Sequence, residues 1–429
     1  MKDYADSISR KRRYISVLNI NNYITHRHDE KICKGSQTKI YAAQIIRIRL
    51  IGPLGFSGYN PSLITGGTVL FRLTFLALLA FSLSIHAAGT DVVAGQYIAM
   101  ARQGDLRQAL ELFRSLDQTG GSQLDHDLAQ QYRHRFVLQD ETTPVVSGNE
   151  FIDHLLEIYS TYWTRSLLGE YDFEAGKEWL EEKIQILLIN HQFKELLENS
   201  SETMSALDKA IVEQGIFFDR SLASPWYDLL MWKNQQRRLL EIELTDQRLE
   251  LEVIFMDDFI SLGWTDFATL GMTSSGGWAA TDAIYCVSWA WNHDSENFQV
   301  SFLKHEGRHF ADFKSFPKLG VIDLEYRAKL TELAFARTTL PRILANFTVN
   351  SAPNLNSPHT FANYLVTLDL HRSVFNTKSP LSGNQLRQVP AEMINEAARV
   401  LLENHTSRLE AAGALTTRGI LAEHAGYAR

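Results

Sequence analysis

The spacing of apolar residues divides the chain into a long helical part, a short alternating part and a second helical part. From about 95 to 245, apolar residues recur every three or four positions, which is the period of a helix with one buried face. The segments that we predict to be helices on this pattern are 151–168, 174–197, 202–214 and 226–244. We expect them to stack on one another and to pack against the rest of the protein.

The pattern changes at about residue 248. Leu249, Leu251 and Val253 alternate with glutamates, close to period two, which predicts a strand that ends near Asp257. A second β-rich run covers 278–291. Helical spacing then returns in 298–313, 321–334 and 388–409. This order predicts an α+β fold that is mainly α-helical, with a small β-sheet preceding the helix over 305–309.

The composition is that of an ordinary globular chain. It has 45% hydrophobic and 21% charged residues over 429 positions, enough for one large domain or two. The net charge of −8 is unevenly distributed. Residues 1–88 contain 12 Lys and Arg against 4 Asp and Glu, whereas 89–429 contain 30 against 46, a balance of −16. Because nucleic-acid binding uses a basic face, we expect no nucleic-acid partner.

Residues 69–88 have the composition of a secretory signal peptide. Arg72 supplies a positive charge, 73–85 form an apolar core of 13 residues, and small residues follow near Ala87. We predict cleavage there, export to the periplasm or the medium, and no membrane association afterwards. Because signal peptides begin chains, residues 1–68 are interpreted as a non-native upstream extension. The alternative is a genuine basic tail followed by a signal anchor that stays in the membrane.

The two cysteines exclude an internal disulfide in the mature chain, because Cys33 lies before the expected cleavage point. Cys286 lies in the apolar run 283–287 and is expected to be a small buried hydrophobic residue. An exported chain without disulfides depends on its apolar core for stability, and this body is long enough to form one.

Residues 305–309 read HEGRH, an H-E-x-x-H motif. On a helix, His305 and His309 project from the same face one turn apart, so both imidazoles can reach one Zn²⁺. Glu306 lies beside them, where a carboxylate can take a proton from water and pass it to a leaving amine. Apolar residues at helical spacing around the motif, such as Phe302, predict that this helix is buried, as a metal site requires.

A third ligand is expected nearby, because catalytic zinc keeps three protein ligands and one open position. The segment 314–320 contains a proline and a glycine and predicts a turn, and 321–334 is strongly helical. Glu325 and Glu332 lie on that helix, 16 and 23 residues after His309. Since they are seven residues apart, they share one helical face, and either can be the third ligand.

This combination of an H-E-x-x-H motif, a short loop and a second helix with a glutamate resembles the gluzincin class of zinc metallopeptidases, the thermolysin-like arrangement. The resemblance covers about residues 250–340 and includes an E-x-x-A pattern at 325–328. The zinc ligands that it implies are His305, His309 and Glu325. It also implies that Glu306 is the general base, and that Glu332 supports a ligand or replaces Glu325 as the third one.

Further side chains are candidates for supporting roles. Asp312, one turn after His309, could accept a hydrogen bond from a ligand imidazole, or it could be a solvated helix residue. Peptide hydrolysis also needs a hydrogen-bond donor for the carbonyl oxygen that becomes negatively charged. The candidates for this donor are His359, Tyr364 and His371, with Arg308 and Arg327 as alternatives.

These patterns predict a helical N-terminal region over 89–247, a zincin-like catalytic region over 248–345 and a C-terminal helical region over 346–429. The predicted protein is a secreted or periplasmic zinc-dependent metallopeptidase. It would hydrolyse a peptide or protein substrate with a metal-activated water and Glu306 as general base. The alternative is a non-catalytic helical binding or scaffold protein of the cell envelope, in which the motif is a coincidence.

Overall fold

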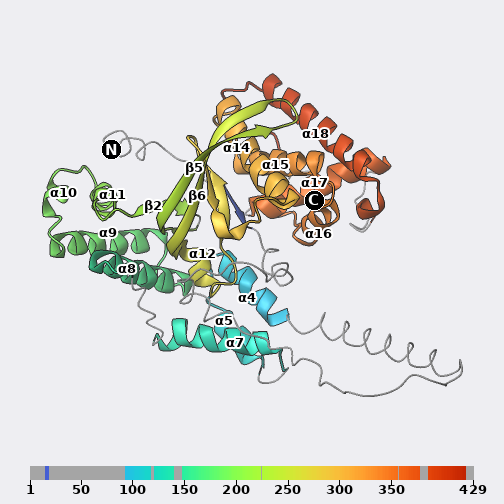
Figure 1. The fold of residues 1–429 in the computed structure, drawn as a ribbon. Coiled ribbons are helices and arrows are strands. Elements are labelled where there is room, and N and C mark those ends of the chain that lie inside the picture. Colours follow the sequence, from blue (N-terminus) through green and yellow to red (C-terminus); the bar gives the residue numbers. More distant parts are fainter. Residues whose placement is uncertain are drawn as a thin grey trace, which may run out of the picture.

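A curled mixed sheet lies between two groups of helices in the computed structural model of this chain (Figure 1). The structure describes residues 15–18, 92–116, 120–139, 147–223, 225–355, 357–376 and 385–421. The predicted signal peptide, 69–88, lies outside the described residues, and so does the predicted extension apart from 15–18. The arrangement is the mainly helical α+β fold that the sequence predicts.

The sheet has the strand order β1-β7-β8-β6-β5-β2. Its strands are β1 (Ile15–Leu18), β2 (Phe217–Asp219), β5 (Leu230–Glu243), β6 (Arg248–Leu262), β7 (Ser275–Ala279) and β8 (Ile284–Val287). A separate antiparallel pair consists of β3 (Leu222–Ala223) and β4 (Trp226–Tyr227). β8 runs parallel to β6, and β7 is antiparallel to both β8 and β1. The strands predicted from about 248 and within 278–291 are thus confirmed, and Cys286 is buried in β8, as expected.

The prediction of a helix over 226–244 is wrong. Most of this segment is β5, which pairs antiparallel with β6 over nearly its whole length, from Leu230 opposite Leu262 to Glu243 opposite Arg248. The segment is rich in Leu, Gln, Arg and Glu, which favour a helix in isolation. Cross-strand pairing with β6 overrides that preference. The boundary predicted at 248 therefore falls between two paired strands, and the regions on its two sides share one sheet.

The N-terminal helices form one side of the molecule. They are α4 (Val92–Arg102), α5 (Ala109–Arg114), α7 (Gln123–Tyr132), the π-helix η1 (Arg133–Leu138), α8 (Glu150–Leu167), α9 (Phe173–Asn190), α10 (Lys194–Glu198) and α11 (Thr203–Glu213). The helices predicted over 151–168 and 202–214 are confirmed as α8 and α11. The one predicted over 174–197 is interrupted between α9 and α10, where Gln192 has a left-handed backbone with φ 65°. The short helix α12 (Gly263–Ala268) follows β6 and packs against α8 and α4.

The C-terminal helices surround one central helix, α15 (Val321–Phe335). The others are α13 (Glu296–Phe298), the π-helix η3 (Gln299–Lys304), α14 (His305–Ser315), α16 (Leu340–Val349), α17 (Pro358–Phe375) and α18 (Ala391–Ala411), with short 3₁₀ turns η2 (Ser288–Ala290) and η4 (Leu386–Gln388). α14, α17 and α18 all pack against α15, and every residue from Asp323 to Ala334 is buried. The predicted helices over 321–334 and 388–409 are confirmed.

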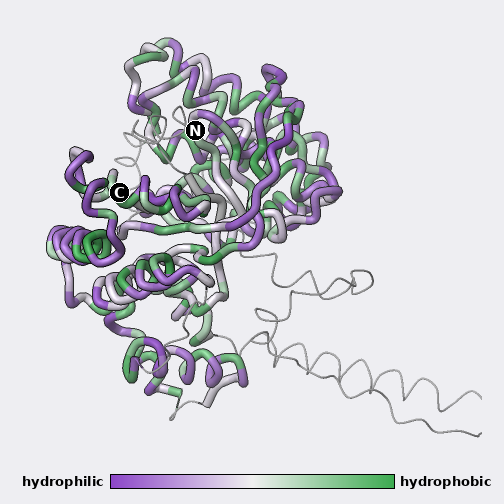
Figure 2. Tube along the Cα trace, turned by 60° about the vertical axis from the view of Figure 1, so that its left-hand side comes forward, coloured by the Kyte–Doolittle hydropathy of each residue, from purple (hydrophilic) through white to green (hydrophobic). Residues whose placement is uncertain are grey.

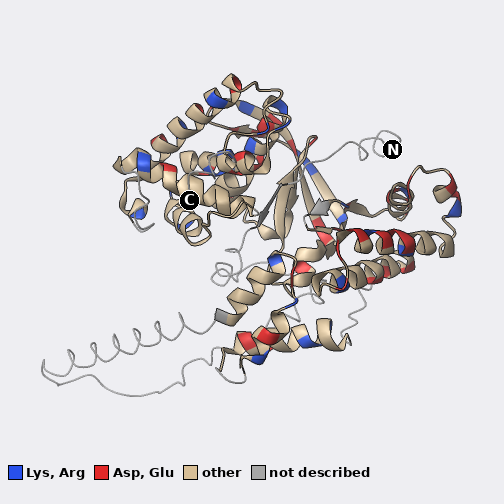
Figure 3. Ribbon diagram, turned by 180° about the vertical axis from the view of Figure 1, so that it is seen from behind, with Lys and Arg blue, Asp and Glu red and all other residues tan. Residues whose placement is uncertain are grey.

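None of the helices in the described part of the chain combines the length and the apolar character needed to cross a membrane. Along the tube in Figure 2, hydrophilic and hydrophobic positions alternate over short distances on the outer helices. Figure 3 shows Lys and Arg interspersed with Asp and Glu along the ribbon, and α9 carries several glutamates. Residues of both charges are thus distributed along the described helices.

Glu296 at the start of α13 anchors the segment that leads into α14. Its carboxylate accepts five hydrogen bonds, from the backbone N–H of Arg337, Thr338 and Thr339 and from both threonine hydroxyls, at 2.6–3.1 Å. Partial burial alone would raise the pKa of Glu296, but these hydrogen bonds outweigh it and lower the pKa to about 2. The carboxylate thereby ties the turn between α15 and α16 to the helices before the H-E-x-x-H motif.

We expect Glu296→Gln to lower the free energy of unfolding by about 2 kcal/mol at pH 7, because it removes charge-assisted hydrogen bonds. Since the folded pKa lies below that of the unfolded chain, this stabilisation is present above about pH 4.5 and is lost as the pH falls toward 2. Urea unfolding of both proteins at pH 7 and at pH 3 measures it. Glu403→Gln, at an exposed position on α18, is the control and should change little. If the free energies of unfolding of wild type and Glu296→Gln differed equally at pH 7 and pH 3, the stabilisation would not come from the ionised Glu296 carboxylate.

Candidate metal centre

The two histidines of the H-E-x-x-H motif lie together at the start of α14, as their spacing predicts. His305 and His309 are both fully buried, and their Nε2 atoms are 3.1 Å apart. The rings meet at an interplanar angle of 83°. Gly307, on the opposite side of the helix, faces Ile242 of β5, where an added Cβ would lie 3.1 Å from Ile242 Cγ2. The helix is therefore packed against the sheet on one side and presents both imidazoles on the other.

Glu325 of α15 completes a group of three possible ligands. Its Oε1 is 3.3 Å from His309 Nε2, and its Oε2 is 3.9 Å from His305 Nε2. Ligand atoms of His305, His309 and Glu325 all lie within 4.8 Å of one another, and all three side chains are buried. The structure thus brings the motif together with the nearer of the two glutamates that the sequence left open.

Glu332 occupies a different place beside His305. Its Oε1 is 2.7 Å from His305 Nδ1, the ring nitrogen opposite the one that faces His309. A carboxylate in this position accepts the Nδ1–H hydrogen and leaves Nε2 unprotonated, with its lone pair directed at the ligand group. Glu332 therefore orients His305, which is the supporting role that the sequence allowed as an alternative to metal binding.

The distances and the unsatisfied atoms fit a zinc ion. Tetrahedral coordination with zinc–ligand bonds of 2.0–2.1 Å places neighbouring ligand atoms about 3.3 Å apart. The two Nε2 atoms are 3.1 Å apart, Glu325 Oε1 is 3.3 Å from His309 Nε2, and the other oxygen, Oε2, is 3.9 Å from His305 Nε2. Both oxygens of Glu325 are buried without a partner in hydrogen-bonding geometry, and so is Glu306 Oε1. Buried carboxylate oxygens without partners are costly, and a cation at the centre of the group would satisfy Glu325.

Glu306 is held by the sheet. The backbone N–H of Ala279, at the end of β7, donates to Glu306 Oε2 at 2.8 Å. β7 reaches this position because Gly277, with φ +144°, has no side chain; a Cβ there would lie 2.5 Å from the ring of Phe302. One oxygen of Glu306 is therefore fixed, and Oε1 remains free to exchange a proton.

The two buried carboxyls are pushed toward opposite protonation states. Burial, reinforced by repulsion from Glu325, raises the pKa of Glu306 well above its usual value. Burial would also raise the pKa of Glu325, but the charges of His359 and Lys329 and contact with His309 hold it well below its usual value. Burial lowers the pKa of His309, which favours the neutral imidazole that a metal needs. Without a metal, this arrangement favours an ionised Glu325 and a neutral Glu306; a divalent cation bound beside Glu306 would favour its ionised form, which a general base needs.

Two further side chains reach Glu325. His359, near the start of α17, places Nδ1 2.9 Å from Glu325 Oε2, and its side chain is 34% exposed. Lys329, one turn after Glu325 on α15, places Nζ 3.3 Å from the same oxygen. His359 was among the residues that the sequence proposed, whereas Lys329 was missed. Its i,i+4 spacing from Glu325 is the signal that could have found it.

Neither interpretation offered for Asp312 is correct. Its carboxylate is buried and forms a two-pronged ion pair with Arg327, at 2.8 Å to Nε and 3.0 Å to Nη2. His309 Nδ1 has no hydrogen-bond partner, so Asp312 does not orient that imidazole. Arg308 is 3.7 Å from Asp312 and bonds to Asp246. Both arginine side chains are buried and engaged in ion pairs, and they are therefore unsuited to stabilising a reacting oxygen. A buried carboxylate is stabilised more by an arginine than by a histidine, because only the guanidinium is permanently charged.

His371 lies away from the ligand group, and the ring contact of Tyr364 is with Phe361 rather than with that group. α17 rises about 1.5 Å per residue, which places His371 about 18 Å along the helix from His359. His371 Nδ1 is 2.8 Å from the Thr367 carbonyl oxygen, and its ring lies near Phe375. Tyr364 packs against Phe361 within the apolar cluster of α15–α18. Of the three predicted donors, the fold brings only His359 to the site.

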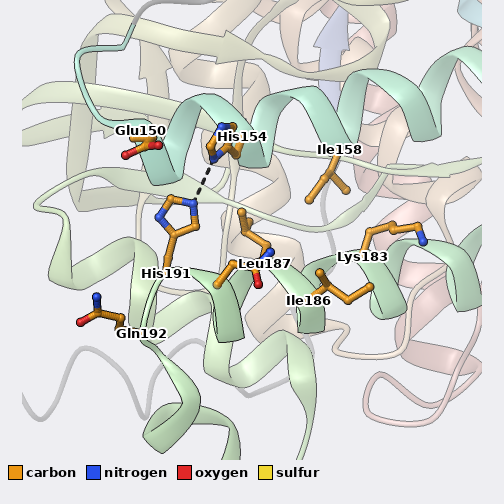
Figure 4. A pocket seen from close by; sticks show the side chains of 9 residues that line it. Glu150, His154, Ile158, Lys183, Ile186, Leu187, His191 and Gln192 are labelled. Carbon is orange, nitrogen blue, oxygen red and sulfur yellow. Dashed lines mark hydrogen bonds between the residues drawn. The ribbon is translucent and has the colours of Figure 1, made fainter.

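A separate pocket of about 540 Å³ lies between α8 and α9 (Figure 4). His154 and His191 meet there with ring nitrogens 3.0 Å apart, above an apolar floor that includes Ile158 and Leu187. Within the described residues, no third ligand atom lies close enough to make this pair a three-ligand metal group. The two histidines join the helices by a hydrogen bond, and the pocket is distinct from the group around α14.

Comparisons with protein-family models, with curated proteins and with solved structures find no match for this chain. Its function is therefore inferred from the geometry of the site.

We expect His309→Ala to abolish zinc binding and Glu332→Gln to weaken it by about 10–100-fold, because the variant loses the carboxylate that orients His305. Elemental analysis gives the zinc content, and titration against a chromophoric chelator gives the affinity. Glu392→Gln, at an exposed position on α18, is the matched control and should bind zinc like the wild type. Full zinc binding by His309→Ala would exclude this group as the metal site.

Proposed function

We propose that this protein is a zinc-dependent metallopeptidase of the gluzincin type, with His305, His309 and Glu325 as metal ligands. The observation that carries the proposal is the convergence of these three buried donors with Glu306, whose free oxygen lies on the same turn of α14. Three protein ligands, two of them histidines, are typical of zinc sites that keep a position open for catalysis. When bound, zinc supplies Lewis acidity, which polarises a carbonyl group and lowers the pKa of water.

Glu306 moves the proton. Its Oε1 takes a proton from the attacking water while the hydroxyl adds to the carbonyl carbon of the peptide bond. The same oxygen then gives the proton to the amide nitrogen as the C–N bond breaks, so the products are a carboxylic acid and an amine and Glu306 returns to its starting state. The Ala279 N–H holds Oε2 throughout and keeps Oε1 directed at the reacting atoms.

His359 is the proposed donor to the carbonyl oxygen. It is the only one of the predicted donors beside the ligand group, and its exposure places it where the site meets solvent. With Nδ1 against Glu325, Nε2 is the ring nitrogen left to donate to a substrate oxygen. A donor at this position would stabilise the negative charge that develops on that oxygen.

We expect Glu306→Gln to retain zinc and to lower kcat for peptide hydrolysis by about 10²–10⁴-fold, because the amide cannot accept the proton. Metal analysis and a screen with fluorogenic peptides measure the two effects on the same preparation. Glu403→Gln is the control for loss of a carboxylate elsewhere. Unchanged hydrolysis by Glu306→Gln would contradict its role as general base, and zinc binding with no hydrolysis by the wild type would favour the non-catalytic scaffold instead.

We also propose that the protein works outside the cytoplasm, in the periplasm or the medium, on the strength of the signal-like residues 69–88. N-terminal sequencing of exported material should find a mature chain that begins close to residue 89. A mature chain that begins before residue 69 would contradict both the cleavage and the interpretation of 1–68 as an extension. Material retained in the membrane would favour the signal anchor.

A further inference from the structure

Lys329 is a buried lysine in contact with a proposed zinc ligand. Its side chain is only 9% exposed, and Nζ lies 3.3 Å from Glu325 Oε2. Nζ also lies 5.1 Å from the centre of the Phe347 ring on α16, so the ammonium is held between a carboxylate and an aromatic face. A lysine is rarely buried without a paired charge, and Glu325 is the partner that the described structure gives it.

The two oxygens of Glu325 have different surroundings. Oε1 faces His309 Nε2 at 3.3 Å, inside the ligand group. Oε2 lies between Lys329 Nζ at 3.3 Å and His359 Nδ1 at 2.9 Å, and it is 3.9 Å from His305 Nε2. The charge of Oε2 is thus offset by Lys329 and His359, whereas Oε1 contacts only the ligand histidine His309 and is the oxygen better placed to bind a metal.

The position of Lys329 is unfavourable for metal binding alone. A positive charge on the far side of a ligand carboxylate repels a divalent cation and withdraws negative charge from the bond between them, most strongly in a buried site. Three buried glutamates, Glu306, Glu325 and Glu332, surround the site. A lysine here reduces the negative charge that the ligands give to the metal. A bound metal would then remain a stronger Lewis acid, as hydrolysis requires.

We infer that Lys329 is a positioning residue that restricts Glu325 to one coordinating oxygen. The inference rests on the proposed zinc site. With Lys329 and His359 both at Oε2, Glu325 binds through Oε1 alone, so one metal position stays open to water and substrate. Because less negative charge reaches the metal, its Lewis acidity is preserved at the expense of affinity.

The test compares Lys329→Met, which keeps the length of the side chain and removes its charge, with Lys329→Arg, which keeps the charge. Lys314→Met is the matched control, because Lys314 is an exposed lysine of α14 that also lies over a phenylalanine ring, 4.3 Å from the centre of Phe310. Zinc affinity is measured on the full chain by competition with a chromophoric chelator. The visible absorption of the Co²⁺-substituted protein reports the coordination number.

Lys329→Met should bind zinc about tenfold more tightly, because a repulsive charge is removed, and should lose peptide hydrolysis activity. Its Co²⁺ absorption should weaken, since Oε2 is then held only by the partly exposed His359 and can join Oε1 at the metal, which raises the coordination number. Lys329→Arg and Lys314→Met should resemble the wild type in zinc affinity and in the Co²⁺ spectrum.

Unchanged or weaker zinc binding by Lys329→Met would overturn the inference, and so would tighter binding with an unchanged Co²⁺ spectrum. In both cases the proposed function stands, because the wild type still binds zinc and hydrolyses peptide. A wild type that binds no zinc would overturn the proposed function and this inference together. If Lys329→Met does not fold, Lys329→Gln, which keeps a hydrogen-bond donor without the charge, undergoes the same measurements with the same criteria.

Discussion

Charged side chains buried on α15 must be paired, and this requirement determines how the neighbouring helices pack around it. The pairs are Asp323 with His405, Glu325 with Lys329, Arg327 with Asp312, and Glu332 with His305. They tie α15 to α18 and α14, and one of them is internal to α15. Removing one partner would leave an uncompensated charge in the interior, which costs about 3–5 kcal/mol. The same contacts that hold the helices together therefore set the distance between the two halves of the proposed site.

The interface between α14 and α15 has a satisfied part and an unsatisfied part. Arg327 and Asp312 meet in a two-pronged pair that uses both carboxylate oxygens. One turn of α14 away, Glu325 is buried beside His305 and His309 with neither oxygen in hydrogen-bonding geometry. Proteins tolerate unsatisfied buried groups mainly where a ligand or a reaction uses them. The contrast within one interface separates the part that stabilises the fold from the part that is suited to bind a metal.

Most of the fold could be predicted from the sequence because most of its elements are local. Helices such as α8 and α15 follow from apolar spacing, and the strand β6 follows from alternation. β5 could not be predicted, because its residues favour a helix and only pairing with β6 makes it a strand. The break between α9 and α10 depends on one left-handed residue, Gln192, which apolar spacing does not reveal.

For the site, the sequence by itself determined that His305 and His309 share one face of a helix with Glu306 beside them, because residues four apart on a helix are neighbours whatever surrounds them. Only the tertiary structure decided that Glu325 joins these histidines while Glu332 orients His305, since seven residues of helix put both glutamates on one face. It also decided that Asp312 pairs with Arg327, and that Lys329 reaches Glu325 Oε2. These choices depend on the distance and angle between α14 and α15, which no local pattern contains.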